Sequence, residues 1–150
     1  MNATTLVQTL VDMVSKNGNL LLDIGPRADG TIVDAEAQSL REAGQWIHAH
    51  AAAIFNTTYW FIMSEVARQG VRFTQADDAF YIFFLVKPSS EAIHVDAPLP
   101  LMAGDEVTVM GGIPSPVEWE KSASSSGFTF FVPESYWEGE KYCWVLKISY

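Results

Sequence analysis

The first third of the chain places apolar residues at the spacing of amphipathic helices. Between Thr4 and Lys16 they recur every three or four residues, which predicts a helix with one broad apolar face. We expect Thr4 or Thr5 to cap this helix and Asp34 to cap a second one, because side-chain oxygens accept from the free amides of a first turn. The apolar side of the second helix consists of Leu40, Gly44, Ile47, Ala51 and Ile54. Each helix should therefore pack against another layer through one face.

Between the two helices lies a nearly continuous apolar run, Leu20 to Ile24, which is typical of a parallel strand covered on both faces. Asn17-Gly18 before it is a helix stop, because glycine tolerates the left-handed conformation that ends helices. Gly25-Pro26 after it ends the strand, because proline cannot continue a ladder. A parallel strand needs strand neighbours, and nothing upstream in this chain supplies them. The pattern therefore predicts helix–strand–helix at the end of something larger.

From about Tyr59 the hydrophobic period shortens from 3.6 towards 2, and turn-rich stretches separate short runs. The expected strands are Val71–Thr74, Phe80–Val86, Ala92–Val95, Glu106–Met110, Val117–Lys121, Phe128–Val132 and Cys143–Ser149. Roughly seven short strands at this spacing indicate an antiparallel sandwich.

This change of period divides the chain into two parts, residues 1–58 and residues 59–150, with the boundary between about Asn56 and Gly70. The serine-rich stretch 122–127 is expected to be a flexible hairpin loop. With 49% hydrophobic residues the chain has enough apolar material for a packed core, so a disordered tail is excluded.

Two runs resemble the glycoside hydrolase family 29 α-L-fucosidases. VSKNGNLLLDIGPRADGTI, residues 14–32, resembles the family segment that forms the last strand of the catalytic (β/α)8 barrel. AGQWIHAHAAAIFNTTYW, residues 43–60, is similar to the final barrel helix and the exit towards the C-terminal β-domain. A weaker likeness continues through VRFTQADDAFYIFFLV, VTVMGG and YCWVLKISY. Asp23 departs from the family, which usually has Asn there, and so does AHAAAIF, where Asn-Gly-Glu-Ala-Ile-Tyr is more common.

The resemblance implies an α/β fragment, the last helix–strand–helix of a (β/α)8 barrel, followed by an all-β antiparallel sandwich. It implies a retaining enzyme that hydrolyses α-linked L-fucose from glycans without a metal or organic cofactor. Retention requires two carboxyl groups about 5–5.5 Å apart. The family supplies them from earlier barrel strands or loops, so no catalytic residue is expected in this chain. Alone it should be inactive and poorly soluble, and its partners should be the remainder of the barrel and fucosylated glycans.

Barrel enzymes build their sites at the carboxyl ends of the strands. In this chain that end consists of Asp23, Gly25, Pro26 and Arg27, which we expect to line the substrate cleft. A structural alternative is that Asp23 caps the Gly-Pro turn. Arg27 could likewise pair with Asp23 or Asp29, or be solvated.

Aromatic residues in the β-region raise the question of sugar stacking. Tyr136 and Trp137 follow one another in a polar loop and are the best candidates for stacking or for an interdomain contact, with packing as the alternative. Trp119 and Trp144 fall on expected strands and should be core. A rival function follows, a non-catalytic carbohydrate-binding or interaction module. The run 14–32 argues against it, because a free-standing sandwich has no use for a barrel strand.

Charge and reactive residues exclude several classes. Eighteen acidic residues against nine basic ones give a net charge of −9, which disfavours binding to nucleic acid and to anionic membranes. A single cysteine, Cys143, allows neither an internal disulfide nor a cysteine metal site. His48 and His50 are about 200° apart around a helix, and His94 is isolated, so no metal site is expected.

Two acceptor patterns for N-glycosylation occur, at Asn2 and at Asn56. They favour a secreted or extracellular protein, with a lysosomal or vacuolar one as the alternative, whose signal peptide lies upstream of this chain. No apolar run reaches the roughly 18 residues that a membrane span needs.

Overall fold

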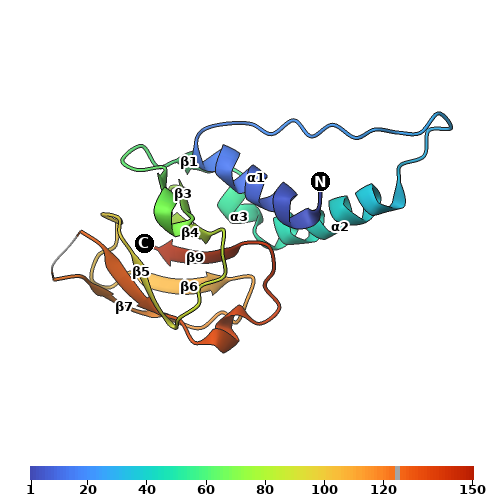
Figure 1. Ribbon diagram of the computed structural model, residues 1–150. Coiled ribbons are helices and arrows are strands. Elements are labelled where there is room, and N and C mark those ends of the chain that lie inside the picture. The colour runs from blue at the N-terminus through green and yellow to red at the C-terminus, as the bar shows by residue number, and fades with distance from the viewer. Residues whose placement is uncertain (124–125) are drawn as a thin grey trace.

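The computed structural model describes residues 1–123 and 126–150. Its helices come first and its strands follow, and Figure 1 shows the helices lying on one side of two stacked sheets. The helices are α1 (Ala3–Ser15), α2 (Asp34–Ala49) and α3 (Ala51–Ile54), with short 3₁₀ turns η1 (Ala67–Gln69) and η2 (Glu134–Trp137) among the strands.

The larger sheet has the strand order β1-β3-β4-β9-β6, and β2 also pairs with β3. Its strands are β1 (Thr58–Tyr59), β2 (Glu65–Val66), β3 (Val71–Gln75), β4 (Ala79–Phe84), β6 (Glu106–Met110) and β9 (Trp144–Ser149). The smaller sheet, in the order β5-β8-β7, consists of β5 (Ala92–Val95), β7 (Glu118–Lys121) and β8 (Phe128–Phe131). All pairings between these strands are antiparallel.

The seven expected strands are all present, with bounds that agree within two residues. Short apolar or alternating runs between turns were a sufficient signal because each strand has a neighbour within the chain. Short β1 and β2 were not expected. Of the serine-rich stretch that was expected to be a flexible loop, Ser124 and Ser125 lie outside the described residues.

The centre of the larger sheet is covered on both faces, and this explains the continuous apolar sequence of β4, whose six residues are all buried. Phe80 and Ile82 point into a core shared with the smaller sheet. Tyr81 and Phe83 point to the opposite face, where they pack with α1 and α2. The architecture is therefore three layers, helices on sheet on sheet.

The helix termini differ from expectation. Asn2 caps α1, since its Oδ1 accepts the amide of Thr5 at 2.8 Å, and neither expected threonine does so. Asp34 is the first residue of α2 rather than its cap, and its negative charge suits the amino end of the helix dipole. Asn17, with φ of 61°, adopts the left-handed conformation after α1.

The predicted strand from Leu20 to Ile24 is not a strand in the structure. The segment runs extended beside α1 towards α2, without any ladder partner among the described residues (Figure 1). Leu21 is 95% exposed and Ile24 is 40% exposed, whereas Leu22 packs against the apolar cluster between the helices and the larger sheet. The physical reason is that strand hydrogen bonds need a neighbouring strand, which a sequence pattern cannot provide.

Candidate functional site

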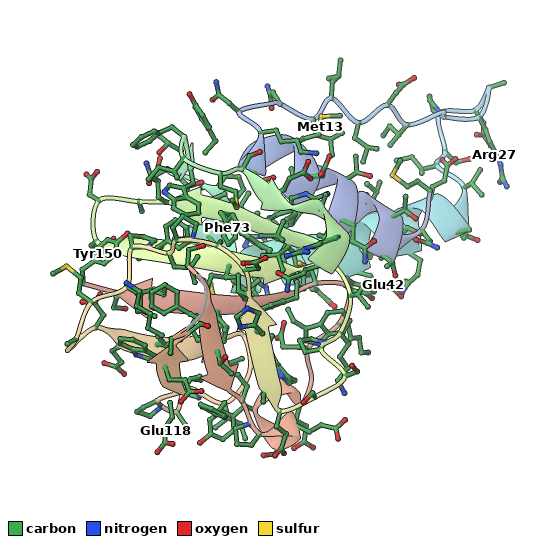
Figure 2. All side chains as sticks on the ribbon, turned by 60° about the vertical axis from the view of Figure 1, so that its left-hand side comes forward. Met13, Arg27, Glu42, Phe73, Glu118 and Tyr150 are labelled. Carbon is green, nitrogen blue, oxygen red and sulfur yellow. The ribbon has the colours of Figure 1, made fainter. Side chains whose placement is uncertain are left out.

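The predicted cleft wall lies on the outer side of the helices. Asp23, Gly25, Pro26 and Arg27 are all exposed, and Figure 2 shows Arg27 at the outer tip of its loop, pointing away from the sheets. These residues are therefore free to face another part of the protein. They do not form an enclosed site by themselves.

A tight turn fixes the end of this segment. The amide of Arg27 donates to the carbonyl of Thr31 at 2.8 Å, and Gly30, with φ of 83°, closes the turn. Asp29 accepts from the hydroxyl and the amide of Thr31, and these two hydrogen bonds lower the pKa of the Asp29 carboxyl. Within the described residues, Arg27 makes neither of its expected ion pairs.

Asp23 also makes no side-chain hydrogen bond to the Gly-Pro turn in the described part of the chain. It borders a small cavity of about 60 Å³ together with Leu22, Ile24 and Glu36. The capping alternative for Asp23 is thus absent here, and the carboxylate stays available at the end of the extended segment.

The surroundings of Trp137 fit the packing alternative rather than sugar stacking. Its side chain is only 4% exposed and meets Phe84 edge-on, with ring centroids 6.4 Å apart. A pyranose needs an open ring face, and this ring is enclosed in the sandwich core. Tyr136 is half-buried against the same core. Trp119 and Trp144 pack against it too, although they are partly rather than fully buried.

A chain of four charged residues joins α1 to the larger sheet. Asp12 lies 2.9 Å from Lys16 and 2.6 Å from Arg72, and Glu65 lies 3.2 Å and 3.0 Å from the same two cations. Burial raises the pKa of the Asp12 carboxyl. Hydrogen bonds from Lys16 and Arg72 lower it by a larger amount, so the net pKa is below the ordinary value. The network holds the helix against β2 and β3.

Sequence reasoning missed a buried pair, His50 and Glu140. The imidazole Nε2 of His50 is 3.0 Å from Glu140 Oε2, and the two side chains are 0% and 7% exposed. By sequence, His50 raises only the question of a metal site. No local signal could have joined them, because they lie far apart along the chain and only the fold brings them together.

The described residues hold neither a metal-binding cluster nor a helix that could span a membrane. Residues 1–123 and 126–150 contain no group of three or more His, Cys, Asp or Glu side chains placed to hold a metal ion. No helix in the same ranges has the length and apolar character for crossing a bilayer.

The two glycosylation acceptors differ in their setting. Asn2 is exposed and uses its Oδ1 as the α1 cap, which leaves Nδ2 free. Asn56 is exposed in the turn after α3 with φ of 57°. Both side chains can therefore be reached from solvent.

Comparison with known proteins gives a consistent result. The family model described as alpha-L-fucosidase matches residues 1–52. The α-L-fucosidase of Branchiostoma floridae is 33% identical over 128 residues, which cover 85% of this chain and 28% of that protein. Human plasma α-L-fucosidase is 33% identical over 116 residues, covering 76% of this chain and 25% of its own.

Solved structures agree over the whole chain. The α-fucosidase of Thermotoga maritima, in complex with a mechanism-based inhibitor, superposes with a TM-score of 0.84 and 29% identity. The match covers 100% of this chain and 34% of that one. The chain therefore spans about a quarter to a third of the length of the proteins it resembles.

Proposed function

Because this chain belongs to the α-L-fucosidase family, as one portion of such a protein, we propose that the complete protein is a retaining enzyme that removes α-linked L-fucose from glycans. The observation that carries the proposal is the likeness to the Thermotoga maritima α-fucosidase, which extends over every residue of the chain. By the complete protein we mean the full-length α-L-fucosidase to which these 150 residues would belong.

The extended segment Leu20 to Ile24 is proposed to be the last strand of the catalytic barrel. Its exposed Leu21 and its lack of ladder partners among the described residues support this role, because a neighbouring strand would cover the side chain and supply the hydrogen bonds. Asp23, Gly25, Pro26 and Arg27 would then stand at the carboxyl end of the strand, where barrel enzymes bind their substrates. They would form a part of the cleft wall, while the catalytic carboxyls come from elsewhere.

We propose the division into residues 1–58, the end of the barrel, and residues 59–150, the β-domain. The apolar cluster that α1 and α2 share with Tyr81, Phe83 and Val145 would then be the interface between them. This interface is the same apolar face that leaves β4 buried on both sides. The remainder of the barrel would be the main partner of the chain.

Localisation outside the cytosol, in a secreted or lysosomal setting, is a further proposal. The relatives include plasma and tissue α-L-fucosidases. The exposed acceptors Asn2 and Asn56 agree with it. Expression in a eukaryotic secretory host should add mass that a glycan-removing amidase takes away. The variants N2Q and N56Q report which acceptor is used.

Hydrolysis of an aryl α-L-fucoside tests the activity. The complete protein should release the phenol, with the α-configured sugar as the first product, and the 150-residue chain should release none. A complete protein with no turnover would overturn the proposal.

The rival, a carbohydrate-binding module, predicts saturable quenching of tryptophan fluorescence by glycans on the chain alone. The burial of Trp137 speaks against that outcome.

A further inference from the structure

His50, at the junction of α2 and α3, is fully buried and surrounded by hydrogen-bond acceptors. Its Nδ1 lies 2.8 Å from the carbonyl oxygen of Trp46. Its Nε2 lies 3.2 Å from the carbonyl oxygen of Met110 and 3.0 Å from Glu140 Oε2. The imidazole thus contacts three separate segments: α2, the end of β6, and the loop that leads into β9.

With Glu140 ionised, both ring nitrogens of His50 need a proton to satisfy these partners. A neutral imidazole has one N–H and one lone pair, so one nitrogen would present its lone pair to an oxygen that also offers only lone pairs. The imidazolium donates at both nitrogens. Among the described residues, Oε2 of Glu140 has no donor other than this ring, so the carboxylate charge depends on the imidazolium for compensation.

An aromatic ring and a closely approaching glycine border the pair. Trp46 stacks on His50 with centroids 4.2 Å apart and an interplanar angle of 15°, which places a cation on an aromatic face. Gly111 approaches the pair closely: a Cβ there would lie 2.3 Å from Glu140 Oε1 and 2.7 Å from His50 Nε2. The pair therefore sits in a tight pocket that excludes larger neighbours.

The other titratable groups around the pair come from two elements. A cavity of about 370 Å³ beside it is lined by Glu42 from α2 and by Lys141 and Tyr142 from the loop. The Tyr142 hydroxyl donates to Glu42 at 3.3 Å. Cys143 is the last residue of this loop, and the pKa of its thiol is raised mainly by burial and also by the Glu140 charge. The end of β6 contributes only the backbone of Met110 and Gly111.

We propose that His50 and Glu140 form a pH-dependent lock that holds α2 and the loop 138–143 together. The lock is closed where His50 carries its proton and Glu140 has lost its own. Raising the pH removes one proton from the imidazolium, so that a nitrogen lone pair faces an acceptor oxygen. The buried carboxylate is then left without its cation. Lowering the pH far enough protonates Glu140 and removes the ion pair. Contact between the helical layer and the sheets is therefore firmest between these limits.

Thermal unfolding of the complete protein between about pH 5 and about pH 9 tests the lock, because histidine changes charge in this range. The midpoint should fall as the pH rises, together with faster hydrogen exchange in residues 138–143. E140Q should lower the midpoint at acidic pH and flatten the pH dependence. The exposed His48, two residues away on α2, provides the matched control H48Q, which should keep the wild-type profile.

A second measurement needs no variant. In protein labelled with ¹⁵N at histidine, the His50 ring should show protons on both nitrogens at about pH 6 and lose one of them at high pH. A ring with one proton at about pH 6 would overturn the proposal. So would a pH profile that H48Q flattens or that E140Q leaves intact.

Discussion

Trp46 donates its indole Nε1–H to the carbonyl oxygen of Cys143 at 3.0 Å, in a fully buried contact. The bond joins α2 to the residue that precedes β9. Trp46 and His50 are one helical turn apart, so the same face of α2 engages the loop 138–143 twice. The helical layer is thus attached to the larger sheet by directed polar contacts as well as by apolar packing.

Replacing Trp46 by Phe keeps an aromatic ring but leaves the Cys143 carbonyl without its donor. A buried unsatisfied group costs about 1–3 kcal/mol. The unfolding midpoint of the complete protein in denaturant should fall accordingly. Trp119→Phe is the control, because Trp119 is half-buried against Phe128 beside the core between the two sheets. An equal or larger loss in the control would contradict the role given to the Trp46 bond.

Gly111→Ala should be more harmful than alanine at another left-handed glycine. Gly111 has φ of 82°, and an added Cβ would lie 2.3 Å from Glu140. Gly104 has φ of 105° and open space around the added atom. Gly104→Ala should therefore cost only backbone strain, about 1–2 kcal/mol, and Gly111→Ala should cost more and also weaken the pH dependence. Equal costs in thermal unfolding would show that Gly111 does not confine the pair.

Asp12→Asn should destabilise the complete protein at neutral pH and not at strongly acidic pH. The folded pKa of Asp12 is lowered, so its ionised form adds stability above the unfolded pKa of about 3.9. That stability disappears as the pH falls through the lower folded pKa. Because the carboxylate is partly exposed, we expect a loss of at most about 1 kcal/mol. The exposed turn residue Asp77 provides the control D77N, which should be neutral at both pH values. A constant effect of Asp12→Asn from about pH 7 to about pH 2 would contradict this account.

Cys143 should resist thiol reagents in the folded protein. Its side chain is 0% exposed, and burial raises the pKa of the thiol, so the reactive thiolate is scarce and enclosed. Mass spectrometry should find no adduct with iodoacetamide under native conditions and one adduct on this residue after denaturation. Rapid native labelling would mean that the loop 138–143 opens readily.

The sequence predicted the strands well because their signal is local. Ala92–Val95 and Glu106–Met110 have the expected bounds, since each alternates apolar and polar residues between turns. Leu20–Ile24 failed as a strand for the opposite reason, since its apolar run requires neighbouring strands that the described part of the chain does not supply. Asn2 as the helix cap was missed because threonine and asparagine are both good caps and only the backbone decides.

The candidate site was less predictable. Trp137 was a reasonable sugar platform by residue type, but its burial depends on how the turn η2 packs on Phe84. The pairing of His50 with Glu140 depends on the three-layer arrangement, which no spacing reveals. The cleft wall at Asp23 to Arg27 remains a prediction, because it rests on the family resemblance and on the exposure of these residues.

Hydrogen–deuterium exchange of residues 20–24 tests the central claim, that this exposed segment is the last strand of a larger barrel. In the complete protein their amides should exchange slowly, because they donate to neighbouring strands, and in the 150-residue chain they should exchange quickly. Fast exchange in both would contradict the account and leave Leu20 to Ile24 as a surface segment.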